Sequence, residues 1–417
     1  MTLERDVHTP STEEASAARR SLPRKPNPPP KLHWDLQPVG APRGPRSRSR
    51  LEATCITDEI QPLASLLGER VLGQDDAVDS LVCALSRPLS GLRDPHRPHL
   101  TSLLLGPTGV GKTETVKTVA EALFGNEKAL TRIDCEEYAH GHEVAKLLGS
   151  PPGYVGHQVE PLLSQDRIDA AHRQVLQGEE GDEAASPLLH RMHRVQKEGY
   201  VSVLLFDEVE KAHPALWNAL LGILEDGVLT LGNNTTVDFT GSLIFLTSNV
   251  GSREMGEVLS GPSLGFGRSE SPKETPPRDE LERVAREAAE KRFPLELLNR
   301  FDETLVYSAL DRPDLEKIFD KFLGEIHDRS VRQAGFPLLI QLSPEARDFV
   351  LAQGTDLRFG ARPLRRAVEK QLVDPLSRLM ASRQLKPGDL VDVEVEDGEL
   401  VFFREEYAET QEERSSS

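Results

Sequence analysis

The sequence predicts an α/β fold, in which a parallel β-sheet is flanked by helices and is followed by a small, mostly helical C-terminal domain ending in a β-hairpin. Three observations predict it. Continuous apolar runs alternate with helical stretches, a glycine-rich segment follows the first of these runs, and the pattern becomes helical after about residue 311. Continuous apolar character indicates strands covered on both faces, as in parallel sheets.

The elements follow in chain order. A helix is expected over residues 75–85, where apolar side chains recur at helical spacing. Strands are expected at 102–105, 129–134, 201–206 and 243–247. Near the C-terminus, alternating runs at 390–395 and 400–403 are joined through Glu396-Asp397-Gly398, which predicts a hairpin.

A phosphate-binding loop is predicted between the first of these strands and a helix at 114–123. Glycines let backbone N–H groups surround phosphates without Cβ clashes, and a helix N-terminus favours anions. Lys112 supplies a positive charge, and the Thr113 hydroxyl suits Mg²⁺. The alternative is a chance glycine-rich turn, which the flanking strand and helix disfavour. ATP and Mg²⁺ are therefore expected at Gly106, Pro107, Thr108, Gly109, Val110, Gly111, Lys112 and Thr113.

A pair of acids ends the strand at 201–206, about 95 residues after the loop. Asp207 suits the role of a second-sphere Mg²⁺ acid, and Glu208 suits that of a base for the attacking water. Acidic pairs after strands are common, so the pair indicates hydrolysis only in combination with the phosphate loop.

Charge is distributed unevenly along the 417 residues. Residues 1–50 carry ten Lys/Arg and five acids, a net +5, so a formal −18 leaves −23 on the remainder. An acidic body disfavours sequence-independent DNA binding. The basic arm could touch nucleic acid or an acidic surface, although a solvated tail is the favoured interpretation.

Composition also indicates a location. No apolar run approaches the roughly 20 residues that cross a bilayer, and the N-terminus lacks the apolar segment of a secretory signal. The three cysteines, Cys55, Cys83 and Cys135, have no metal-ligand spacing and are expected to be small core residues. A cytoplasmic protein without a membrane partner is expected.

The predicted domains are a disordered basic tail at 1–55, a large ATPase domain at 56–310, a small lid domain at 311–405 and a disordered tail at 406–417. The large domain contains an insertion at 157–203 and a loop at 252–279.

Six segments in this order resemble the Clp family of AAA-plus ring unfoldases, specifically the second ATPase module of its two-ring members. They are Val-Leu-Gly-Gln (71–74), the phosphate loop, Phe-Asp-Glu-Val-Glu-Lys-Ala-His (206–213), Thr-Ser-Asn (247–249), Leu-Asn-Arg-Phe-Asp-Glu (298–303) and Gly-Ala-Arg-Pro-Leu-Arg-Arg (360–366).

The resemblance implies further roles at the nucleotide. Val71 and Leu72 would pack on adenine, and Asn249 would orient the attacking water. Arg300 would be the finger given to the ATP of the next subunit, and Arg362 would reach the γ-phosphate from the lid. A surface ion pair is the alternative for each arginine.

The segment 149–156 resembles the loop that lines the central pore of Clp rings. Compared with the family, residues 157–203 are an insertion, and a helix at 188–195 within it is expected to project near that pore. Tyr154 and Val155 would grip an extended polypeptide there, whereas without the resemblance a Pro-Gly turn with a half-buried tyrosine would be favoured. Leu264, Gly265 and Phe266 match the tripeptide with which some relatives dock on a ClpP peptidase. The alternative is that Phe266 packs on its own module.

The sequence thus predicts a ring-forming ATPase, expected to be a hexamer, that threads polypeptides through its pore. It could also serve a ClpP-type peptidase. A nucleotide-switched adaptor ring that recruits partners without unfolding them is the alternative, and a DNA-remodelling ATPase is disfavoured by the acidic body.

Overall fold

The computed structural model describes residues 56–149, 160–178, 186–196, 199–260, 278–332, 335–356 and 360–405. Both predicted tails lie outside the described residues. So do the expected pore residues Tyr154 and Val155 and the expected docking residues Leu264, Gly265 and Phe266.

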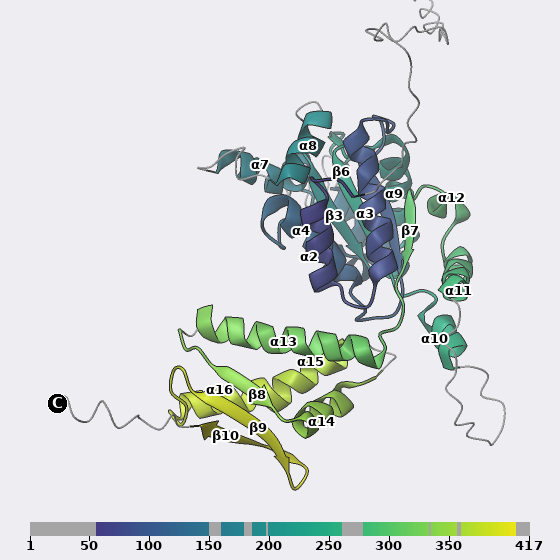
Figure 1. Cartoon of the computed structure of the whole chain (residues 1–417). Helices are drawn as coiled ribbons and strands as arrows, with labels where there is room; N and C mark the ends of the chain where they lie inside the picture. The colour runs from purple at the N-terminus through teal and green to yellow at the C-terminus, as the bar shows by residue number, and fades with distance from the viewer. Residues whose placement is uncertain are drawn as a thin grey trace, which may run out of the picture. The chain divides into compact units, whose positions relative to one another are not determined.

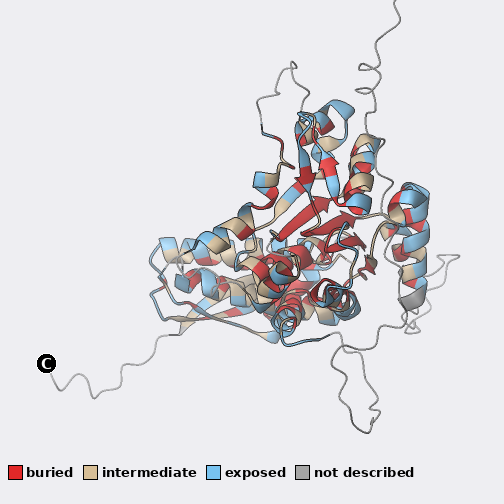
Figure 2. Cartoon of the chain, turned by 90° about the horizontal axis from the view of Figure 1, so that it is seen from above, coloured by how far each residue is buried: buried red, intermediate tan, exposed pale blue. Residues whose placement is uncertain are grey.

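A five-stranded parallel sheet forms the centre of the large domain, with the strand order β2-β3-β6-β1-β7. Every residue of β1, β3 and β6 is buried, as the continuous apolar runs predicted. Figure 2 shows these strands in red beneath more exposed helices. The strands are β1 (Leu100–Leu105), β2 (Thr131–Asp134), β3 (Ser202–Asp207), β6 (Ser242–Ser248) and β7 (Glu303–Val306).

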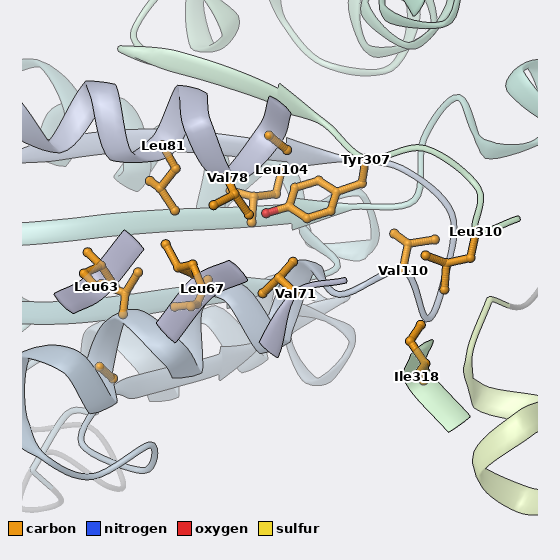
Figure 3. Close-up of a cluster of buried hydrophobic side chains, with 14 of the residues drawn as sticks. Leu63, Leu67, Val71, Val78, Leu81, Leu104, Val110, Tyr307, Leu310 and Ile318 are labelled. Atoms are coloured by element: carbon orange, nitrogen blue, oxygen red, sulfur yellow. The ribbon is translucent and has the colours of Figure 1, made fainter. Parts of the chain in front are cut away.

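Helices cover both faces of the sheet (Figure 1). Leu104 faces the core shared with α2 (Gln61–Arg70), α3 (Asp75–Ser90) and α4 (Lys112–Phe124), and Figure 3 shows it beside Leu67 and Val78. Leu103 faces the other core. The helices of that second side include α5 (Gly141–Leu148), α9 (Pro214–Asp226), α11 (Arg278–Arg292) and α12 (Leu295–Leu298).

The helix expected at 75–85 is α3. Asp75 and Asp76 stand in its first turn, where carboxylates complement the helix dipole, and Gly91 ends it in the left-handed conformation. Its buried stripe is the predicted one: Ala77, Val78, Leu81, Val82 and Leu85. The predicted α/β fold class is confirmed.

The helix predicted at 188–195 exists as α8 (Pro187–Val195), but the expectation that it projects is wrong. Leu188, Leu189 and Met192 are buried in the core that α3 and α4 share. Leaving three apolar side chains in water would cost more than packing them, so the helix lies on the module. Two short helices, α6 (Gln165–Ile168) and α7 (Ala170–Gln177), precede it.

Further elements differ from expectation. Residues 252–260, expected within a loop, form α10 (Ser252–Ser260), which packs against α11. β7 joins the sheet beside β1, although its four residues gave no separate strand signal. β4 (Val228–Thr230) and β5 (Thr236–Asp238) make a small separate hairpin. Two short 3-10 helices are η1 (Cys135–Tyr138) and η3 (Val209–Lys211).

The C-terminal part combines helices with a three-stranded sheet of order β10-β9-β8. The predicted hairpin is present as β9 (Leu390–Glu396) and β10 (Glu399–Glu405), while its parallel partner β8 (Leu339–Leu342) was not expected. The helices are α13 (Arg312–Arg332), α14 (Pro344–Gly354), α15 (Arg362–Val368) and α16 (Asp374–Ala381), with the π-helical turn η4 (Glu369–Val373) between the last two.

Cys135 and Cys83 differ in burial and in bonding. Cys135 is a free, buried core residue, as expected. Cys83 is half-buried and disulfide-bonded, so the expectation of three simple core cysteines is wrong for Cys83.

Candidate functional site

The phosphate loop leaves β1 at Leu105 and enters α4 at Lys112. Its glycines have positive φ angles, 149° at Gly106, 78° at Gly109 and 110° at Gly111, which other residues rarely adopt. A Cβ on Gly106 would lie 2.6 Å from the Tyr307 carbonyl oxygen. The loop therefore requires glycine both for its conformation and for its close packing on the segment after β7.

Lys112 is buried at the centre of the loop. Its Nζ donates to the carbonyl oxygens of Gly106 at 2.6 Å and Pro107 at 2.7 Å, and to Asn249 Oδ1 at 2.9 Å. Burial lowers the pKa of Lys112 to about 8, with Glu210 and Asp207 opposing the shift. The ammonium group is thus poised beside the loop where phosphate oxygens would compete for it.

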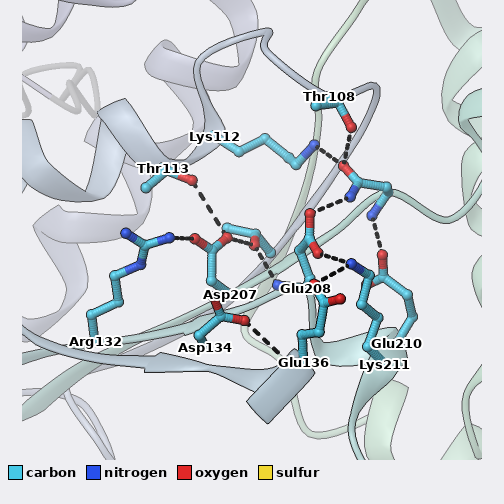
Figure 4. Close-up of polar contacts among 12 residues, drawn as sticks. Thr108, Lys112, Thr113, Arg132, Asp134, Glu136, Asp207, Glu208, Glu210 and Lys211 are labelled. Carbon is cyan, nitrogen blue, oxygen red and sulfur yellow. Dashed lines mark hydrogen bonds and ion pairs between the residues drawn. The ribbon is translucent and has the colours of Figure 1, made fainter. Parts of the chain in front are cut away.

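Asp207 ends β3 next to the loop (Figure 4). Its Oδ1 accepts hydrogen bonds from Thr247 Oγ1 at 2.5 Å and Thr113 Oγ1 at 3.4 Å, and its Oδ2 pairs with Arg132 at 2.7 Å. A hydroxyl and a carboxylate side by side are the oxygen donors that Mg²⁺ prefers. Thr113 and Asp207 therefore fit the predicted metal role.

Glu208 follows in a left-handed conformation, with φ 56° and ψ 50°. This conformation costs about 1 kcal/mol or more in a residue other than glycine, and several contacts hold it in place. The Glu208 N–H donates to Thr247 Oγ1, and its carboxylate binds Asn249 Nδ2 at 3.2 Å and Lys211 Nζ at 2.5 Å. Glu208 and Asn249 both line the cavity described below.

Asn249 connects the loop to the acids. Its Oδ1 accepts from Lys112 and from Thr108 Oγ1, while its Nδ2 donates to Glu208. Its backbone N–H donates to Glu210 Oε1 at 3.0 Å. The predicted sensor, base and loop lysine thus form one hydrogen-bonded set.

A cavity of about 250 Å³ adjoins this set. Its apolar wall includes Val71 and Leu72, the residues predicted to contact adenine. Figure 3 shows another part of this wall, where Val110 lies beside Leu310 with Ile318 close by. The other lining residues are Arg70, Thr108, Gly109, Gly111, Lys112, Thr113, Glu114, Asp207, Glu208, Thr247, Asn249, Lys321, Phe322, Glu325, Ala361, Arg362 and Arg365.

The lid contacts the phosphate loop at Gly109. Ala361 N–H donates to the Gly109 carbonyl at 3.0 Å, and a Cβ on Gly360 would lie 2.5 Å from that oxygen. Arg362, the next residue, begins α15 at the cavity edge, and its charge contributes to lowering the pKa of Lys112. The predicted second sensor is therefore close to the loop lysine.

Arg300 lies elsewhere. It is not among the described residues that line the cavity, and its guanidinium pairs with Glu225 at 2.8 Å. Its predicted action on the ATP of another subunit is untested in a single chain.

Sequence reasoning missed several supporting residues. Thr247, Glu210 and Lys211 lie inside the quoted motifs, so their presence was visible although their contacts were not. No sequence motif pointed to Arg132, because its ion pair with Asp207 arises only when β2 pairs with β3 in the folded sheet.

The described ranges lack two features. They contain no group of three or more His, Cys, Asp and Glu side chains that could hold a metal ion. None of their helices combines the length and apolarity that membrane crossing requires.

Comparison with known proteins gives consistent matches. Residues 97–186 and 179–304 match the family described as AAA domain (Cdc48 subfamily), and residues 310–393 match the C-terminal D2-small domain of ClpB protein.

Curated relatives share more than a third of the aligned positions. The chain is 37% identical over 345 residues to the chaperone protein ClpB of Pseudomonas putida, covering 83% of this chain and 35% of that protein. It is 36% identical to the negative regulator of genetic competence ClpC/MecB of Bacillus subtilis, covering 83% and 38%. Heat shock protein 100 of Trypanosoma brucei brucei is 37% identical, with 82% and 34% covered. The chain thus spans about a third of these relatives' length.

Proposed function

This chain belongs to the Clp-type AAA-plus ATPases, and from that premise we propose that it couples ATP hydrolysis to protein remodelling by threading polypeptides through the pore of a ring. One observation carries the proposal: Lys112, Asn249 and Glu208 form a continuous hydrogen-bonded set beside a cavity of about 250 Å³. A loop lysine, a neutral amide and a carboxylate are the groups that ATP hydrolysis requires.

The chain's own residues suit the steps of hydrolysis. Thr113 and Asp207 would hold Mg²⁺, which neutralises phosphate charge when bound. The Lys112 ammonium would exchange loop carbonyls for phosphate oxygens. Glu208 would accept the proton of the attacking water, while Asn249 holds its carboxylate in position.

Apolar residues next to the loop, an arginine of the lid and an arginine of a neighbouring subunit complete the proposed site. Val71 and Leu72 would pack on adenine, and Arg362 would reach the γ-phosphate from the lid, so that hydrolysis changes the lid contact. Arg300 would stabilise transition-state charge in the adjoining subunit of a ring, which we propose to be a hexamer. Isolated subunits should therefore be nearly inactive.

The first test replaces Glu208. We expect Glu208→Gln to bind ATP with near-normal affinity yet hydrolyse it at least about a hundredfold more slowly, because general-base catalysis contributes 10²–10⁴-fold. Phosphate release and nucleotide affinity measure the two effects. Glu290→Gln, on the exposed part of α11, is the matched control. Wild-type turnover in Glu208→Gln would remove Glu208 from this role.

The second test concerns threading. Tyr154 and Val155 lie outside the described residues, and the family resemblance alone supports their role. Tyr154→Ala should retain ATPase activity but fail to unfold a stably folded fluorescent reporter. A wild-type protein that hydrolyses ATP without unfolding any reporter would favour the adaptor ring instead.

A peptidase partner and a cellular location complete the proposal. ClpP coupling through Leu264, Gly265 and Phe266 predicts that a peptidase ring captures the wild type but not Phe266→Ala. DNA binding is not proposed, because the body is acidic. A cytoplasmic location is proposed from the sequence, in which no apolar run reaches the length that crosses a bilayer.

A further inference from the structure

A second polar cluster lies at the start of β1, the end opposite to the phosphate loop. It joins Arg97, Thr101, Arg300 and Asp302, which come from the segment before β1, from β1 itself and from the turn before β7. No part of this cluster lines the nucleotide cavity. The cluster centres on the backbone of Arg300.

Thr101 forms the buried half of the cluster. Asp302 Oδ2 accepts from the Thr101 N–H at 2.8 Å and from its Oγ1 at 2.7 Å, and the Asp302 N–H donates to the Thr101 carbonyl at 2.9 Å. Thr101 Oγ1 also lies 3.2 Å from the Arg300 carbonyl oxygen. These contacts connect the residues on either side of Phe301 to a fully buried strand residue.

Arg97 forms the other half. Its guanidinium donates to the Arg300 carbonyl at 2.7 Å and to the Leu224 carbonyl at 3.3 Å, and it lies 3.5 Å from Asp302 Oδ1. Leu224 immediately precedes Glu225, the ion-pair partner of the Arg300 side chain. The Arg97 guanidinium therefore hydrogen-bonds the backbone at Arg300 and at Leu224, the residue before Glu225. It links the two segments that carry the Arg300–Glu225 ion pair.

We infer that Arg97, Thr101 and Asp302 are positioning residues for Arg300. The inference rests on the proposed role of Arg300 in the neighbour's ATP hydrolysis. An arginine has a long, flexible side chain, so its catalytic value depends on where its backbone is held, and a displacement of about 1 Å can cost 10²-fold in rate. The Arg300–Glu225 ion pair cannot fix the position of the Arg300 backbone. Both side chains are about a third or more exposed (33% and 45%), and exposed ion pairs hold their geometry weakly.

A simpler role for the cluster is to fasten β7 to β1. The two strands already pair from Ser102 and Glu303 onward, so the sheet has its own ladder. The test must therefore separate a fold defect from a catalytic one.

Thr101→Val removes the hydroxyl and keeps the shape, whereas Thr101→Ser keeps the hydroxyl. We expect Thr101→Val to lower kcat about tenfold or more, with the affinity for ATP and the assembly close to those of the wild type, because the nucleotide cavity is untouched. Losing the buried hydrogen bond to Asp302 should lower the melting temperature, so the fold defect is measured separately from kcat. Thr101→Ser should retain most of the wild-type kcat. Arg283→Ala, which removes an exposed ion pair on α11, is the matched control.

The decisive measurement is a double-mutant cycle with Arg300→Ala. If Thr101 acts through Arg300, adding Thr101→Val to Arg300→Ala lowers kcat no further, because no guanidinium remains to be positioned. An equal loss in both backgrounds would overturn the inference, as would a normal kcat in Thr101→Val. An unchanged kcat in Arg300→Ala itself would instead overturn the proposed function of Arg300, so the two failures are distinguishable.

Discussion

At the scale of single residues, hydrogen bonds hold the Lys112 ammonium group in a position suited to a negatively charged ligand. A buried ammonium must be hydrogen-bonded, and the chain supplies two loop carbonyls and Asn249 for it. Glu208 is held just as firmly in a strained backbone conformation, by Thr247, Asn249 and Lys211. The chain's own contacts thus hold both groups in place, which reduces the rearrangement that hydrolysis needs.

The pKa of Lys112 predicts how ATP binding depends on pH. Because the pKa is lowered to about 8, the ammonium form is present below pH 8 and is lost as the pH rises through it. Triphosphate favours the ammonium, so the affinity should be nearly constant around pH 7 and fall by up to about tenfold per pH unit above 8.

Fluorescent-nucleotide titrations of Glu208→Gln between about pH 7 and 9.5 measure this dependence. Lys112→Arg is the control, since a guanidinium stays charged throughout and should remove the dependence whatever its affinity at neutral pH. A constant affinity for the lysine protein across this range would contradict the prediction.

At the level of elements, the site lies where parallel strands end and the chain turns at glycine residues. Parallel pairing brings the carboxyl ends of β1, β3 and β6 to one edge, which places the loop, the acids and Asn249 together. The lid adds α15, whose entry at Gly360 touches the carbonyl of Gly109. That contact is close enough that no side chain fits between the two segments.

Gly360→Ala tests this contact. The new Cβ would lie 2.5 Å from the Gly109 oxygen, so the loop or the lid must shift, and ATP affinity should fall about tenfold or more. Gly335→Ala is the matched control, because Gly335 has the same φ of 57° but nothing within 4 Å of a Cβ.

Both substitutions carry about 1–2 kcal/mol of backbone strain, visible as a lower melting temperature. Only Gly360→Ala should also weaken nucleotide binding in direct titrations. Equal ATP affinities for the two variants would show that the lid contact has no part in binding.

At the scale of the whole molecule, the cavity draws its walls from the large domain and from the lid. Val71 and Asn249 line it from the first, Ile318 and Arg362 from the second. A ligand that contacts both parts stabilises the folded chain as one unit, by an amount that mass action sets.

Arg362→Ala tests the lid's share in this stabilisation. In the Glu208→Gln background, ATP at a hundred times its dissociation constant should stabilise the fold by about 2.7 kcal/mol. If Arg362 contributes a tenfold share of affinity, the same ATP concentration stabilises the Arg362→Ala protein by only about 1.4 kcal/mol.

Chemical unfolding with and without ATP measures both values. Arg378→Ala, which removes an exposed arginine from α16 of the same lid, should keep the full stabilisation. An undiminished stabilisation in Arg362→Ala would exclude Arg362 from the nucleotide site.

The sequence by itself determined the features that are local in the chain. The phosphate loop, the acids after β3, the helical stripe of α3 and the C-terminal hairpin are each encoded within a few consecutive residues, so their spacing could be interpreted directly. Recognising the fold class and the family followed from the order of such segments.

Only the tertiary structure decided which distant residues meet. Arg132 reaches Asp207 through strand pairing, α8 packs on α3 and α4 instead of projecting, and Thr101 binds the segment around Arg300 about 200 residues later. No local pattern encodes these contacts, because they depend on the sheet order and on which apolar faces compete for the same core.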